Sequence, residues 1–81
     1  MSDGAAVITV LGRPGCHLCE EALAALAPIA AEHGATIDEI NIELDDALLR
    51  AHLERIPVIL VGGKEICHFF VDSKAVRAAL S

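Results

Sequence analysis

Basic side chains are scarce in this sequence, and long apolar runs are missing. Only six residues are Lys or Arg against twelve Asp or Glu, which gives a net charge of −6. This balance argues against nucleic acid as a partner, because neutralising phosphates requires clustered basic residues. No run approaches the ~20 apolar residues that span a bilayer, and the start MSDGAAVITV has no secretory signal. We therefore expect no nucleic-acid partner, no membrane partner and a cytoplasmic location.

Aromatic residues and cysteines are also few. Phe69 and Phe70 are the only aromatics, so the hydrophobic 54% of the chain is mainly Ala, Leu, Ile and Val. The three cysteines are an odd number that fits poorly with a framework of structural disulfides, which are rare in the cytoplasm. A length of 81 residues suits a single globular domain, residues 1–81, with a thin core. We expect this domain to be a monomer.

The first half of the chain predicts a strand, a helix and a second strand. The β-branched run VITVL at 7–11 is typical of a buried strand and is stopped by GRPG. After Cys16, apolar residues recur at three- and four-residue steps up to Gly34, which predicts an amphipathic helix. Pro28 lies inside this pattern and is expected to kink the helix or to end its regular part early. The stretch TIDEINI at 36–42 predicts the second strand.

The second half predicts a short helix, a β-hairpin and a final helix. Phe69 and Phe70 are expected on opposite sides of the strand predicted at 64–70, and we expect one of the two to lie in the core. The element order β-α-β-α-β-β-α implies a parallel strand pair with a right-handed crossover. It predicts an α/β sandwich with a mixed four-stranded sheet. The predicted elements are a helix at 45–53 with Asp45 as its N-cap, a strand at 58–62, a strand at 64–70 after the Gly62-Gly63 turn, and a helix at 73–80 capped by Asp72.

Cys16 and Cys19 form a Cys-X-X-Cys pair where the first strand gives way to the helix. Free backbone N–H groups and the helix dipole favour a thiolate on Cys16 at this position. Arg13 and His17 add positive charge, and the carboxylates of the first turn oppose it. Cys19 lies one turn further along the same side of the helix. We expect Cys16 to be exposed and attacking, and Cys19 to be more buried and resolving, as thiol–disulfide exchange requires.

The same pair allows other interpretations. It can be two small buried residues, since free cysteines are commonly buried. With Cys67 and either His17 or His68, it also offers the four N/S ligands that tetrahedral zinc prefers, and cysteines alone suit an iron–sulfur cluster. However, neighbouring residues 67 and 68 point to opposite sides of a strand, and the second half lacks the usual two-ligand spacing. We therefore predict no metal site and keep a metal-binding module as an alternative.

The motifs GRPGCHLCEEA and RIPVILVGGKE, together with the element order, resemble the thioredoxin fold and, within it, the small glutaredoxin-like proteins. The resemblance extends over essentially the whole chain. It implies a thioredoxin-like three-layer sandwich and a thiol–disulfide oxidoreductase with Cys16 as nucleophile and Cys19 as resolving cysteine. It also implies that Pro57 is the cis-proline facing the pair, and that Arg13, Ile56 and Pro57 bind substrate. The implied substrate is a protein or low-molecular-weight thiol or disulfide.

The chain departs from the glutaredoxin pattern at three places. Glutaredoxins typically have Pro-Tyr between the two cysteines, where this chain has His17 and Leu18. Arg55 replaces the Thr of their Thr-Val-Pro segment. Cys67 and His68 stand where the family has two glycines that let the backbone lie close to glutathione. We therefore expect no resident cofactor, leave glutathione open as a co-substrate, and keep a redox-inactive adaptor of the same fold as a further alternative.

Overall fold

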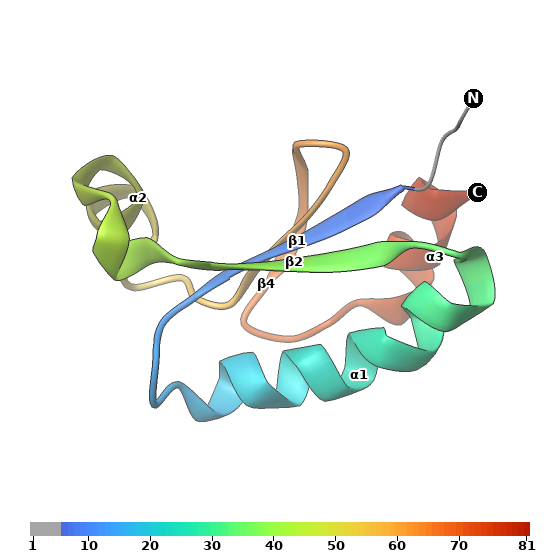
Figure 1. Cartoon of the computed structure of the whole chain (residues 1–81), viewed down its shortest axis with the longest axis horizontal. Helices are drawn as coiled ribbons and strands as arrows, with labels where there is room; N and C mark the ends of the chain where they lie inside the picture. Colours follow the sequence, from blue (N-terminus) through green and yellow to red (C-terminus); the bar gives the residue numbers. More distant parts are fainter. Residues whose placement is uncertain (1–5) are drawn as a thin grey trace.

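The fold is a four-stranded sheet with helices on both of its faces, seen in a computed structural model that describes residues 6–81 (Figure 1). The strand and helix types follow the order expected from the sequence. In chain order the elements are β1 (Val7–Gly12), α1 (His17–His33), β2 (Thr36–Asn41), the 3₁₀ turn η1 (Ile42–Leu44), α2 (Asp46–His52), β3 (Val58–Val61), β4 (Lys64–His68) and α3 (Ser73–Leu80).

The sheet is mixed, with the strand order β2-β1-β3-β4. β1 pairs in parallel with β2, whereas β1–β3 and β3–β4 are antiparallel. The predicted α/β class with a mixed four-stranded sheet is therefore confirmed. In the β1–β3 ladder Leu11 pairs with Val58. The loop that follows β1 and the residue that precedes β3 consequently meet at one end of the sheet.

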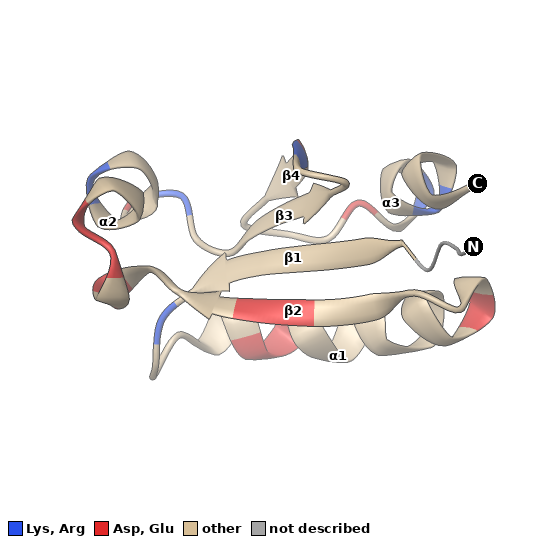
Figure 2. Cartoon of the chain, turned by 45° about the horizontal axis from the view of Figure 1, so that its top comes forward, with Lys and Arg blue, Asp and Glu red and all other residues tan. Residues whose placement is uncertain are grey.

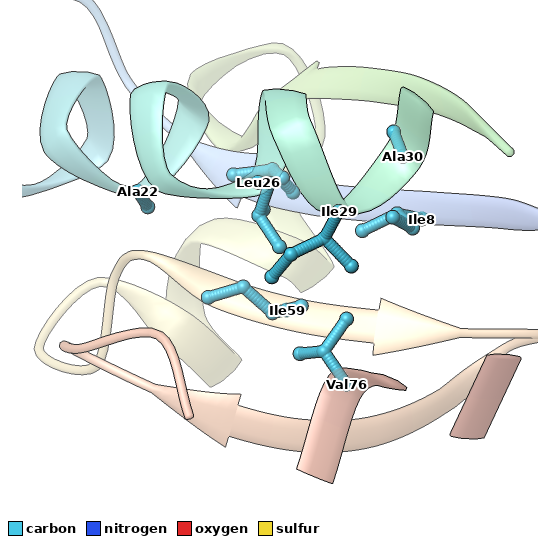
Figure 3. Packing of buried hydrophobic residues seen from close by; sticks show 8 residues of the cluster. Ile8, Ala22, Leu26, Ile29, Ala30, Ile59 and Val76 are labelled. Carbon is cyan, nitrogen blue, oxygen red and sulfur yellow. The ribbon is translucent and has the colours of Figure 1, made fainter. Parts of the chain in front are cut away.

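The main core lies between the sheet and the two helices α1 and α3. Alternate β1 residues, such as Ile8 and Val10, point to this side, where Leu26 and Ile29 of α1 and Val76 of α3 meet them (Figure 3). The opposite face carries a smaller cluster of Leu11, Ile42 and Val58, against which Leu48 and Leu49 of α2 pack. These three layers are those expected of the fold, because alternation along a strand supplies both faces.

Helix α1 begins and ends as predicted, but it does not stop at its proline. Cys16 is the N-cap, and Gly34 ends the helix in the left-handed conformation, with φ 64°. Pro28 is exposed within the helix, which continues to His33, so of the two expected effects of this proline the early end is wrong, and the kink stays a prediction. Pro28 removes one backbone hydrogen bond, but the buried side chains of Leu26 and Ile29 on either side of it keep both halves of the helix on the sheet.

The prediction that one phenylalanine enters the core is also wrong. β4 ends at His68, and Phe69 and Phe70 both lie exposed beyond it. A register irregularity in the β3–β4 ladder pairs Ile59 with Cys67, and Cys67 then packs against the main core. Phe69 has φ 65°, and its N–H donates to the carbonyl of Pro57 at 2.8 Å. The chain therefore turns away from the sheet before either aromatic ring reaches the interior.

Charged side chains lie mostly outside this core. Figure 2 shows acidic residues on α1 and β2 and beside α2, and basic residues in the loop after β1 and on α3. Arg77 of α3 forms two hydrogen bonds of 3.1 Å to Glu32 of α1. These bonds and the guanidinium charge lower the pKa of Glu32. Within residues 6–81, none of the helices has the length and apolar character needed to cross a membrane.

Candidate redox site

The two cysteines of the predicted pair meet at the start of α1. Cys16 has an extended backbone, with φ −89° and ψ 108°, and caps the helix. Its sulfur accepts a hydrogen bond from the backbone N–H of Cys19 at 3.1 Å. The Cα atoms of Cys16 and Cys19 are 5.2 Å apart, and their sulfur atoms lie at disulfide distance. The sequence spacing thus places both sulfurs within bonding reach, as expected.

The two sulfurs differ in their access to solvent. Cys19 is 4% exposed and belongs to the buried side of α1. Cys16 is half-buried, less exposed than expected but more accessible than its partner. A disulfide or thiol from outside can therefore approach Cys16 more readily than Cys19. This asymmetry is the one that an attacking and a resolving cysteine require.

Gly12, the last residue of β1, leaves the space that the Cys19 side chain occupies. A Cβ atom built at Gly12 would lie 2.8 Å from Cys19 Sγ and 3.3 Å from Cys19 Cβ. Gly12 is itself buried. Sequence analysis missed this residue, because the first glycine of GRPG is also explained by the turn alone. The absence of a side chain at Gly12 makes room for the buried sulfur of Cys19.

Replacement of Gly12 by alanine is expected to lower the free energy of unfolding by about 1–3 kcal/mol, the usual cost of overpacking a core position. The added methyl cannot be accommodated unless Cys19 moves. Urea denaturation under reducing conditions measures this loss. In a Cys19→Ala background most of the loss should disappear, because the clashing sulfur is absent. An equal loss in both backgrounds would contradict the proposed contact.

Pro57 lies at the same end of the sheet as the cysteine loop. The Ile56–Pro57 peptide bond is cis, and Pro57 is fully buried just before β3. Ile56 is half-buried and packs against the cluster of Leu11, Ile42 and Val58. The cis geometry implied by the family resemblance is therefore present. The roles of Ile56 and Pro57 in substrate binding stay predictions.

The two side chains expected to support a Cys16 thiolate, Arg13 and His17, each lie beside a carboxylate. Arg13 lies 3.0 Å from Glu43, and His17 Nε2 lies 2.7 Å from Glu21 Oε2. Arg13 also lines a pocket of about 270 Å³ beside the ends of β1 and β2. The hydrogen bond that reaches the Cys16 sulfur comes from the backbone N–H of Cys19. Arg13 lies near the site, and its role in substrate binding stays a prediction.

Cys67 and His68 have other partners. The sulfur of Cys67 accepts a long hydrogen bond of 3.5 Å from the N–H of Asp72, and the imidazole of His68 lies 3.6 Å from Glu65. Glu65 in turn bonds to Arg55. Across residues 6–81, the structure gathers no group of three or more His, Cys, Asp or Glu side chains that could hold a metal ion. The ligand set considered for zinc is thus not assembled.

Residues 7–81 match the family described as Glutaredoxin-like domain (DUF836), and the chain belongs to this family. Two mycobacterial relatives are Uncharacterized protein Mb0520 from Mycobacterium bovis and Uncharacterized protein Rv0508 from Mycobacterium tuberculosis. Each is 32% identical to the chain, with the match covering 91% of this chain and 81% of the relative. The family assignment agrees with the glutaredoxin-like character expected from the sequence.

Solved structures support the same fold. Protein Ne2328 from Nitrosomonas europaea is 36% identical and superposes with a TM-score of 0.87, covering 100% of this chain and 98% of that one. Protein XcR50 from X. campestris is also 36% identical, with a TM-score of 0.69 over 90% of this chain and 93% of its own. A malarial protein at 13% identity and a TM-score of 0.66 shares the fold alone, over 95% and 94% of the two chains.

Proposed function

We propose that the protein is a thiol–disulfide oxidoreductase in which Cys16 is the nucleophile and Cys19 the resolving cysteine. The observation that carries this proposal is the position of the Cys16 sulfur at the N-terminus of α1. There the Cys19 N–H donates to it at 3.1 Å, and the helix dipole favours negative charge. A thiolate is the reactive form of cysteine, so this position supports nucleophilic attack.

The reaction proceeds as two exchanges. The Cys16 thiolate attacks one sulfur of a substrate disulfide, forming a mixed disulfide and releasing the other substrate sulfur as a thiolate that takes up a proton. Cys19 then loses its proton and attacks the Cys16 sulfur. This second step closes the Cys16–Cys19 disulfide and releases the remaining substrate thiol. Two electrons have passed from the pair to the substrate, and an external thiol reductant returns them.

Further assignments belong to the proposal. Pro57 shapes the site beside the cysteine loop, since Leu11 and Val58 pair across β1 and β3. Arg13 steers an anionic thiol or disulfide toward Cys16. The chain works as a monomer in the cytoplasm, where a reducing environment regenerates the dithiol. It needs no resident cofactor or metal, and glutathione is a candidate reductant.

The pair is expected to titrate as one two-electron couple. The midpoint reduction potential of the Cys16–Cys19 pair should lie between roughly −270 and −120 mV, the interval covered by thioredoxin-like oxidoreductases. Equilibration in defined thiol–disulfide buffers, followed by alkylation and mass measurement, gives the oxidised fraction. Cys67→Ser should leave the midpoint unchanged, because Cys67 lies outside the pair. A pair that stays reduced in every buffer, or a disulfide that includes Cys67, would contradict the proposal.

A further inference from the structure

A groove of about 210 Å³ lies between α1 and the segment that joins β4 to α3. Leu18, the second of the two residues that separate the cysteines, lines the groove at one side. Ala22 and Ala25 continue this wall along α1, the segment 69–71 forms the opposite wall, and Glu21 is the one charged residue in the lining. We call this feature the apolar groove.

The apolar groove displays both aromatic residues of the chain. Phe70 is 69% exposed and Phe69 39% exposed. Large apolar side chains gathered at one surface commonly mark a contact with a partner, and aromatic side chains are enriched among the residues that dominate binding. Both phenylalanines line the groove together with Leu18, which lies between the two cysteines in the sequence.

The backbone holds the two phenylalanines in this exposed arrangement. Phe69 adopts φ 65°, a left-handed conformation that bulky residues rarely take and that often accompanies function. Its N–H donates to Pro57 and the N–H of Phe70 donates to His68, each at 2.8 Å. The segment is therefore tied to Pro57, at the same end of the sheet as the cysteines.

The charge of the groove is negative. Glu21 lines it, and no Lys or Arg does. The exposed contact between Glu21 and His17, at 2.7 Å, is one that a partner's cation can replace. The net charge of −6 adds to this field. A ligand with carboxylates would meet repulsion here, whereas a Lys or Arg beside an apolar side chain would be complementary in both respects.

We propose that the apolar groove binds a protein substrate by a segment in which the reactive cysteine is flanked by an apolar and a basic residue. The apolar side chain contacts Leu18 and Phe70, and the basic one contacts Glu21. This inference rests on the proposed function and adds the class of substrate. The groove acts on the encounter before the sulfurs react, and the exchange steps themselves are unchanged.

Three disulfide substrates test this inference with the reduced protein. They are the symmetric disulfides of acetyl-Leu-Cys-Lys-amide and acetyl-Ser-Cys-Glu-amide, and hydroxyethyl disulfide, with acid quench and mass measurement as the readout. We expect the Leu/Lys peptide to react at least about tenfold faster than the Ser/Glu peptide, equivalent to ~1.4 kcal/mol of binding. Phe70→Ser should remove most of this ratio, and Phe70→Leu should retain it.

Controls separate the groove from general effects of surface composition. Leu44 is 84% exposed in η1 and outside the groove, so Leu44→Ser should keep the ratio. Glu21→Gln should lower the ratio of the rates for the Leu/Lys and the Ser/Glu peptides. Glu54→Gln, which removes another surface carboxylate, should leave this ratio unchanged. Equal rates for the two peptides, or a ratio unchanged by Phe70→Ser, would overturn the inference. Failure of the wild-type protein to react with hydroxyethyl disulfide would instead overturn the proposed function.

Discussion

Cys16→Ser is expected to lower the rate of disulfide reduction at least about a thousandfold, because it removes the attacking nucleophile. The hydroxyl that replaces it cannot form the mixed disulfide. The Cys19 sulfur cannot take over this role, because Cys19 is only 4% exposed and its side chain fills the space beside Gly12. Reduction of hydroxyethyl disulfide, with dithiothreitol present to regenerate the protein, measures the loss as oxidised dithiothreitol formed above the background without protein.

Cys19→Ser should behave differently, because it leaves the nucleophile and removes only the resolving sulfur. The first exchange still occurs, so a mixed disulfide between Cys16 and the substrate should accumulate and be visible as a mass increase. Cys67→Ser is the matched control for loss of a thiol and should keep wild-type turnover. Retained turnover in Cys16→Ser, or a substrate adduct that forms on Cys19 in Cys16→Ser but not on Cys16 in Cys19→Ser, would contradict the proposed roles.

The second large effect is expected on stability. Leu26 is 0% exposed and packs within the main core with Ile8 and Ile29 (Figure 3). Leu26→Ala should lower the free energy of unfolding by about 2–5 kcal/mol, since it removes buried methyl groups and leaves a cavity. A domain of this size has only about 5–15 kcal/mol in total. This one substitution is therefore expected to remove a large share of the total stability.

Leu44→Ala makes the same chemical change at a position that is almost fully exposed. It should change the free energy of unfolding by less than about 0.5 kcal/mol, as surface substitutions do. Urea denaturation of the oxidised protein, with the disulfide intact in both variants, gives the comparison. Similar losses for Leu26→Ala and Leu44→Ala would mean that the core does not lie where the structure places it.

The fold was predictable wherever local patterns determine it. The apolar run at 7–11 and the helical periodicity after Cys16 gave β1 and α1 close to their observed bounds. The capping roles of Asp45 and Asp72 followed from their position before helical stretches, and both accept backbone hydrogen bonds there. The cis bond before Pro57 was implied by family resemblance, because the preference of a single X–Pro bond is too weak to predict it.

The errors arise where distant contacts override local patterns. The end of β4 depends on its register against β3 and on the bond from Phe69 to Pro57, neither of which is visible in the stretch KEICHFF. Helix α1 continues through Pro28 because the sheet holds its two halves. The candidate site shows the same limit. The Cys16–Cys19 spacing was informative, but the contact between Gly12 and Cys19 joins residues from two elements, and the partners of Arg13 and His17 depend on side-chain placement.

The parts of the site come from strands with different numbers of neighbours. β1 leads into the cysteine loop and β3 follows Pro57, and each of these strands has a neighbouring strand on both sides. β4 is an edge strand and is followed directly by Phe69 and Phe70. Central strands open less readily than edges. Changes in the aromatic segment can thus alter the choice of partner while the sulfur chemistry persists. Substitutions confined to residues 69–71 would then redirect the protein to other substrates and leave the residues of the cysteine loop and Pro57 as they are.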